Sequence, residues 1–154
     1  MSILIKNTTI ISGEEKLADY VSGFLSLRPT PRVPIGAIVS SSDTIYKAVA
    51  ECSKAGMKVF NFEEIPLLEF FASLGNAILS GEPLAIRFKN IIPNEISSKL
   101  KLIADGVLDL SATEEKTFKA QGAGSFGGRV LLCLSDKNYE KSNLEGIVTS
   151  VCRI

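Results

Sequence analysis

The sequence contains no histidine. Histidine is the commonest general base and a frequent metal ligand in proteins, because its side chain titrates near neutral pH. Its absence excludes serine–histidine and cysteine–histidine nucleophile systems. Any catalysis would have to use carboxylates, lysine, backbone amides or a metal on oxygen ligands. We therefore identify no catalytic residue, no metal site and no cofactor from the sequence.

The chain also lacks an excess of charge of either sign, since 17 Lys and Arg residues balance 17 Asp and Glu residues. Proteins dedicated to nucleic acids usually carry a basic excess that neutralises phosphates. The composition therefore disfavours nucleic acid as a partner, although net charge does not show how the charges are distributed. The length of 154 residues, with 45% hydrophobic and 22% charged residues, is typical of one packed domain.

Long apolar runs are absent as well. A membrane-spanning helix needs about 20 consecutive apolar residues, and no run approaches that length. The first eleven residues are interrupted by Lys6 and Asn7, which is not the pattern of a secretory signal peptide. We expect a soluble protein without a membrane partner.

Cysteine is scarce, and the three that occur do not form a motif. Cys52, Cys133 and Cys152 are an odd set, far apart, without the CxxC spacing of redox or metal sites. Cys133 and Cys152 lie within apolar runs, where cysteine usually behaves as a small buried hydrophobe. We expect all three to be reduced and structural, and the protein to be cytoplasmic.

The first two thirds of the chain alternate between strand and helix patterns. Short β-branched or continuously apolar runs predict strands, and apolar residues that repeat at three and four positions predict helices. The strands are expected at 3–11, 35–39, 57–62 and 84–88, and the helices at about 14–27, between 42 and 56, at 64–79 and at 94–103. This alternation is typical of a parallel sheet built from βαβ crossovers.

After residue 104 no helix pattern recurs. Polar turns separate the strands expected at 104–110, 117–120, 129–134 and 146–152. Consecutive strands joined by turns favour antiparallel pairing. We therefore predict a single α/β domain over residues 1–154. It is expected to be a three-layer, mostly parallel sheet with helices on both faces, ending in an antiparallel β extension.

A polar cluster, Ser40-Ser41-Ser42-Asp43-Thr44, stands between the second strand and its helix. In doubly wound parallel sheets, ligands bind at this edge. Hydroxyl groups and free helix amides suit a phosphate, whereas Asp43 would repel one unless a metal intervenes. The same residue types also cap helices. Both interpretations, a ligand site and a helix cap, stay open.

The glycine-rich segment 122–128 (GAGSFGG) contains the pattern GxGxxG. A dinucleotide-binding loop would be followed by a helix, but the next residues are β-like. A protein kinase would need a strand lysine and a catalytic lobe, for which too few residues remain. The segment is then a hairpin turn, or a loop in which Gly122, Gly124 and Arg129 contact an anion or a neighbouring subunit. Phe126 is expected to fill a groove of the same chain or a pocket of a partner.

The helix expected at 64–79 is apolar on more than one side, and Glu69 is its only charge after Glu64. A surface helix normally carries one apolar stripe. Phe70 and Phe71 therefore lie either deep in the core or in a subunit interface. The second interpretation predicts a homo-oligomer or a protein partner.

Residues 74–154 contain, in order, a strand at 84–88, a helix at 96–103, the segment 104–110 (ADGVLDL) and a basic, glycine-bearing turn at 119–122. This order resembles the late core of RecA-like ATPases of the KaiC and archaellum-motor type. The P-loop pattern GxxxxGK[ST] is missing, and no apolar strand ends in an acidic residue that would place Mg²⁺. The resemblance implies a RecA-like or Rossmann-like fold in which ATP hydrolysis has been lost.

Three functions are consistent with these patterns. The principal prediction is a non-catalytic interaction or scaffold module within a homo- or hetero-oligomeric assembly. The alternative is a small-molecule or nucleotide-binding protein, with residues 40–44 and the glycine-rich segment facing one crevice at the carboxyl ends of the strands. The third is an enzyme that uses carboxylates and a divalent metal.

Overall fold

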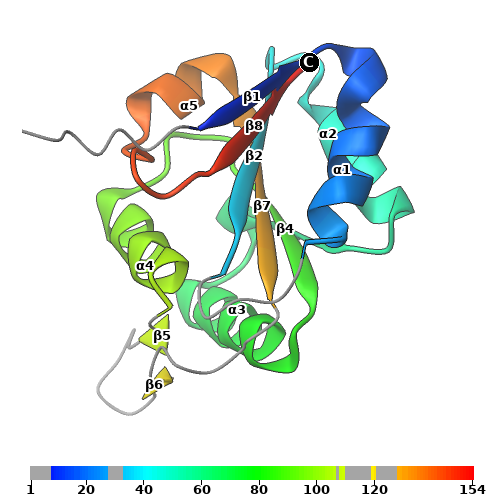
Figure 1. The fold of residues 1–154 in the computed structure, drawn as a ribbon. Coiled ribbons are helices and arrows are strands. Elements are labelled where there is room, and N and C mark those ends of the chain that lie inside the picture. Colours follow the sequence, from blue (N-terminus) through cyan, green and yellow to red (C-terminus); the bar gives the residue numbers. More distant parts are fainter. Residues whose placement is uncertain (1–7, 28–32, 107, 110–118, 121–127) are drawn as a thin grey trace, which may run out of the picture.

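The computed structural model describes residues 8–27, 33–106, 108–109, 119–120 and 128–154. Within these ranges the chain forms a six-stranded sheet in which every pairing is parallel, in the order β1-β8-β2-β7-β4-β3 (Figure 1). Its strands are β1 (Thr9–Ser12), β2 (Ile35–Ser40), β3 (Lys58–Asn61), β4 (Pro83–Arg87), β7 (Arg129–Ser135) and β8 (Ser150–Arg153). The helices are α1 (Leu17–Leu25), α2 (Ile45–Lys54), α3 (Leu67–Ser80), α4 (Asn94–Ala104) and α5 (Asp136–Lys141), with short 3₁₀ helices at Glu14–Lys16 and Phe62–Glu64.

Helices cover both faces of this sheet. Helices α1 and α2 pack on one face, and α3, α4 and α5 pack on the other (Figure 1). Along β2, Ile38 points into the core beneath α1 and α2, whereas Ala37 and Val39 point into the core on the opposite face. Every residue of β2 is buried, as expected for an apolar strand between two layers of helices. The predicted α/β fold with helices on both faces is confirmed.

One polar contact holds α1 on the sheet. The hydroxyl oxygen of Tyr20 lies 2.7 Å from Ser150 Oγ on β8, and Ser150 is the register partner of Gly36 on β2. A Cβ atom at Gly36 would lie 2.3 Å from the same hydroxyl oxygen. Glycine at position 36 therefore makes the room that the Tyr20 hydroxyl occupies.

The predicted antiparallel extension of the sheet is wrong. Strand β7 is central and pairs in parallel with β2 and β4, and β8 pairs in parallel with β2 and β1. The two strands are connected by α5, a six-residue helix with no buried residue. Such a helix has no apolar stripe that its sequence period could reveal. Among the described residues, antiparallel pairing is limited to β5 (Leu108–Asp109) and β6 (Lys119–Ala120), which form a separate two-stranded sheet.

Candidate functional site

The carboxyl ends of β2 and β7 lie at the centre of the sheet. Ser40 and Ser135 end these strands and are register partners. From β2 the chain passes to α2 on one face, and from β7 it passes to α5 on the other. In doubly wound sheets, ligands bind outside the carboxyl ends of two neighbouring strands whose connections leave toward opposite faces. The predicted cluster at residues 40–44 lies at this topological switch point.

The cluster does not cap α2. Thr44 is the N-cap residue of this helix, but its side chain makes no capping hydrogen bond. Its hydroxyl oxygen instead lies 2.9 Å from Ser41 Oγ, and Ser40 Oγ donates to the Ser41 carbonyl oxygen at 3.0 Å. Ser42 and Asp43 are exposed. The hydroxyl groups of Ser40, Ser41 and Thr44 therefore bond within the turn and do not cap the first amides of α2. Of these amides, that of Lys47 donates to the Thr44 carbonyl oxygen at 3.0 Å.

A partly buried arginine also lies toward the carboxyl ends of the strands. Arg87 ends β4 and is the register partner of Cys133 on β7. Since Ala85 packs beneath α2, Arg87 shares that face of the sheet. Its Nε atom is buried and has no hydrogen-bond partner in the part of the chain that the structure describes. In the sequence, the signal for this residue was a single charge at the end of an apolar strand.

Residues 40–44 and Arg129 do not face one crevice. Arg129 begins β7, whereas Ser135, the register partner of Ser40, ends it. A seven-residue strand spans about 20 Å. Arg129 therefore lies at the amino ends of the strands, opposite to residues 40–44, and its guanidinium donates to the Leu27 carbonyl oxygen there. The other residues predicted for this loop lie outside the described residues: Gly122, Gly124 and Phe126.

Phe70 and Phe71 belong to the core and are 0% and 2% exposed. The Phe70 ring packs edge-on against Phe62, with 4.9 Å between the ring centroids, and it also contacts the Phe71 ring at 5.7 Å. Of the two interpretations of these residues, the structure supports the core. Neither side chain reaches the surface, so neither is available to a partner.

Helix α3 nevertheless presents other apolar residues outward. Leu68 and Leu79 are 52% and 50% exposed, and Glu69 is the only charged residue of this 14-residue helix. Strand β3 beside it is an edge of the sheet, and β4 is its partner among the described strands. We call the strand edge together with the outward side of α3 the β3–α3 face. Its residues are Lys58, Phe60, Leu68, Glu69, Ala72, Ser73, Asn76, Leu79 and Ser80.

A small cavity of about 130 Å³ opens in the β3–α3 face. Phe60 lines it from the strand, and Ser73, Asn76, Ala77 and Ser80 line it from the helix. An ion pair of 3.6 Å between Lys58 Nζ and Glu82 Oε2 joins two further residues of its lining. Cofactors and drug-sized ligands occupy pockets of about 300–1,000 Å³. This cavity is suited to a single side chain instead.

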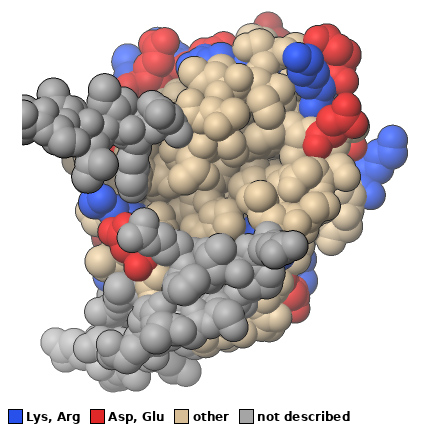
Figure 2. Space-filling model, viewed as in Figure 1, with Lys and Arg blue, Asp and Glu red and all other residues tan. Residues whose placement is uncertain are grey.

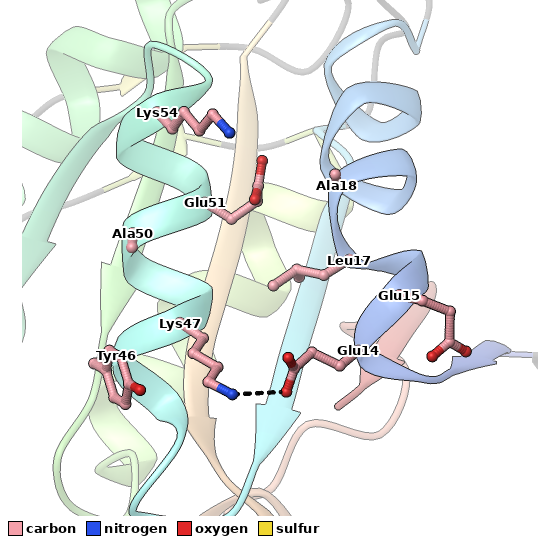
Figure 3. Close-up of a pocket in the computed structure, with 9 residues that line it drawn as sticks. All are labelled: Glu14, Glu15, Leu17, Ala18, Tyr46, Lys47, Ala50, Glu51 and Lys54. Atoms are coloured by element: carbon pink, nitrogen blue, oxygen red, sulfur yellow. Dashed lines mark hydrogen bonds and ion pairs between the residues drawn. The ribbon is translucent and has the colours of Figure 1, made fainter.

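A larger groove of about 340 Å³ lies between α1 and α2 (Figure 3). Glu14 and Lys47 form an ion pair of 2.9 Å across it. The hydrogen bond that Lys47 Nζ donates to Glu14 Oε1 raises the pKa of Lys47. Glu51 and Lys54 extend into the space between the helices (Figure 3). Acidic and basic side chains are mixed along this side of the molecule (Figure 2). None of these four charged side chains is buried, so the groove lacks the converging buried polar groups of a binding site.

The three cysteines lie in the core beneath α1 and α2, and the prediction that they are buried is confirmed. A hydrogen bond with Cys52, together with burial, raises the pKa of the Cys133 thiol well above its ordinary value. Burial also raises the pKa of Cys152. Thiols kept protonated in an apolar core are weak nucleophiles and weak metal ligands.

Membrane-spanning helices and clusters of metal ligands are both absent from the described ranges. No helix there is long and apolar enough to cross a membrane. No group of three or more His, Cys, Asp or Glu side chains is placed there to hold a metal ion.

Comparisons with protein-family models, with curated proteins and with solved structures find no match for this chain.

Proposed function

We propose that this chain is a non-catalytic α/β module that acts by binding another protein chain, with the β3–α3 face as its binding surface. The proposal includes a RecA-like fold that no longer hydrolyses ATP. In P-loop proteins a glycine-rich loop with a lysine joins a strand to the following helix. Here the corresponding link between β2 and α2 at the switch point, Ser40–Thr44, contains neither glycine nor lysine. The lack of histidine further narrows the chemistry that the chain can perform.

The observation that carries this proposal is the outward side of α3, on which Glu69 is the only charged residue. Leu68 and Leu79 stand near its two ends, both about half exposed, with Ala72 and Asn76 between them. By contrast, the α1–α2 side carries charges of both signs (Figure 2). Interface cores are depleted of charged residues, and contiguous exposed apolar surface marks binding sites. The adjacent edge of β3 adds backbone groups that a partner strand can pair with.

Site-specific crosslinking in cells that make the protein tests this proposal. A photoreactive benzophenone amino acid replaces Leu68 in one variant, and Tyr46 in a control variant. Tyr46 lies on α2 and is 59% exposed, so both probes are equally accessible. We expect a discrete crosslinked species from position 68 and none from position 46, with mass spectrometry identifying the second chain. A folded variant that gives no crosslink from position 68 overturns the proposed function.

A second function, binding of a small anionic ligand, is favoured by the switch point between β2 and β7. The first amides of α2 lack a side-chain cap there, and Ser42 is exposed beside them. The Arg87 Nε atom on the same face of the sheet has no partner among the described residues. Helix amides and an arginine together suit a phosphate group. The exposed carboxylate of Asp43 opposes such a ligand.

Thermal unfolding in the presence of inorganic phosphate or ATP tests this second function. A ligand at 100 times its Kd stabilises the folded state by about 2.7 kcal/mol, which raises the Tm of a chain of this length by about 5–10 °C. Arg87→Met should abolish the shift. Lys89→Met is the matched control, because Lys89 already pairs with Glu64 at 3.0 Å. A Tm unchanged by millimolar anion would remove this candidate.

A further inference from the structure

We infer that two copies of this chain join their sheets through β1, which pairs antiparallel to β1 of the second copy across a two-fold axis beside Ile10. This surface is separate from the β3–α3 face, because β1 and β3 are the two opposite edges of the sheet. The inference therefore goes beyond the proposed function and does not depend on it. A closed two-fold dimer needs a surface that is complementary to itself. The backbone, the side chains and the surroundings of β1 each meet that requirement.

The backbone groups of β1 point alternately toward β8 and toward the open edge. The Thr9 amide donates to the Thr149 carbonyl oxygen at 3.1 Å, so Thr9 faces β8. In a parallel ladder, every second residue directs both its amide and its carbonyl group to the same neighbouring strand. Ile10 and Ser12 therefore direct theirs away from β8, to the edge, where the structure places no further strand among the described residues. The same alternation applies to Thr8, immediately before the strand.

A two-fold axis beside Ile10 brings these outward groups together. It places Ile10 opposite Ile10 of the second copy, and Ser12 opposite Thr8 of the second copy. Opposed residues of this kind exchange two hydrogen bonds per pair, with Cα atoms about 5.5 Å apart. Gly13 has a φ of 119° and leads into the 3₁₀ helix at Glu14–Lys16, so the extended segment ends at Ser12. This register therefore pairs every described residue of the segment, from Thr8 to Ser12.

The side chain of Ile10 provides an apolar contact at the axis. Ile10 is 60% exposed. Its register partner Val151 packs into the core on the face covered by α3, α4 and α5, so Ile10 points to that face. In the dimer the two Ile10 side chains are direct cross-strand neighbours there, and each shields the other from water.

The charge pattern of the edge favours a second copy as the occupant. A residue at a two-fold axis faces itself, and like charges that are directly opposed destabilise a strand pair. Residues 8–12 carry no charge. Natural edge strands are usually kept from pairing by lysine, proline or a bulge. Strand β3 has an exposed Lys58, whereas β1 has neither a charge nor a proline, and its register with β8 is unbroken.

The helices leave this edge open. The Tyr20 hydroxyl oxygen of α1 lies 2.7 Å from Ser150 Oγ on β8, and a Cβ atom at Gly36 on β2 would lie 2.3 Å from it. Helix α1 therefore lies over β8 and β2, inside the edge. Figure 1 shows β1 between α1 on one side and α5 on the other. Because the contact is confined to one strand edge, the interface is small, and small interfaces associate weakly. We expect dissociation in the micromolar range.

Sedimentation equilibrium of the purified full chain across the micromolar range tests this inference. The variants Ile10→Lys and Ile10→Glu each place like charges opposite each other across the axis, and Tyr46→Lys, 59% exposed on α2, is the control. We expect the wild type and the control to dimerise equally, and each Ile10 variant to dimerise at least about tenfold more weakly. An equimolar mixture of the two Ile10 variants should form dimers that neither variant forms alone, since lysine then faces glutamate across the axis.

A wild-type chain that stays monomeric throughout this range overturns the inference. A dimer that both Ile10 variants leave unchanged overturns β1 as the surface. A mixture that stays monomeric overturns the axis beside Ile10. These outcomes are independent of crosslinking from position 68, so failure of this inference is distinguishable from failure of the proposed function. Circular dichroism of the variants at low concentration checks that substitution of this exposed side chain leaves the fold intact.

Discussion

The contact among Tyr20, Gly36 and Ser150 allows a quantitative test of how α1 is held on the sheet. The perturbation is Gly36→Ala. The added Cβ would lie 2.3 Å from the Tyr20 hydroxyl oxygen and 3.0 Å from both Leu131 Cδ2 and Phe24 Cε1. Because α1 packs closely on the sheet here, the helix must move to admit the methyl group. Overpacking of a core position costs about 1–3 kcal/mol.

The Tyr20 hydroxyl determines how large that cost is. In the wild-type chain, Tyr20→Phe removes the 2.7 Å hydrogen bond with Ser150 Oγ, which costs about 1 kcal/mol. In the Gly36→Ala background the same change also removes the atom nearest to the new methyl group. We therefore expect Tyr20→Phe to be neutral or stabilising there, a non-additivity of about 1–2 kcal/mol.

The assay is urea unfolding, monitored by circular dichroism, of the wild type, Gly36→Ala, Tyr20→Phe and the variant that carries both changes. A free-energy change of 1 kcal/mol corresponds to about 2–4 °C in Tm for a chain of this length. Gly23→Ala on α1 is the matched control, because a Cβ there meets nothing within 4 Å. It should leave stability unchanged or raise it by up to about 1 kcal/mol through helix propensity. Equal costs of Tyr20→Phe in the two backgrounds would refute the reasoning.

Three further predictions concern ionisation, thiol reactivity and catalysis. Burial raises the pKa of Tyr20 above its ordinary value of 10.0, so the folded state keeps a phenolic proton that the unfolded state loses. Stability should therefore fall above that pH by up to about 1.4 kcal/mol per pH unit from this group, and less steeply in Tyr20→Phe, as urea unfolding at alkaline pH would show. The three buried cysteines should react with a disulfide reagent at about pH 8 only as fast as the chain unfolds, and a faster thiol would contradict their burial. The chain should not hydrolyse ATP, because it has no P-loop lysine. Phosphate release above a no-protein control would contradict this, and its loss on Ser42→Ala or Asp43→Asn would place the activity at the switch point.

The local patterns of the sequence determined the fold class. The apolar run at 35–39 predicted a strand covered on both faces, and β2 is buried throughout. The stripe of Leu17, Tyr20, Val21, Phe24 and Leu25 predicted a helix. The first four are the buried side chains of α1, and Leu25 is partly buried. Such patterns succeed because burial of one side of a strand or helix leaves a period that neighbouring residues share. Helix α5 has no buried side, and the crossover between β7 and β8 therefore left no trace in the pattern.

The tertiary structure alone decided which residues share a site and which reach the surface. Phe70 and Leu68 belong to the same apolar helix, but packing on the sheet buries the first and leaves the second half exposed. Residues 40–44 and Arg129 lie at opposite ends of the strands because β7 runs parallel to β2, with Ser40 paired to Ser135. Strand direction and register are set by contacts between segments far apart in the chain. Periodicity reports only whether a residue faces the core or the solvent, so it carries no information about which strand lies beside it.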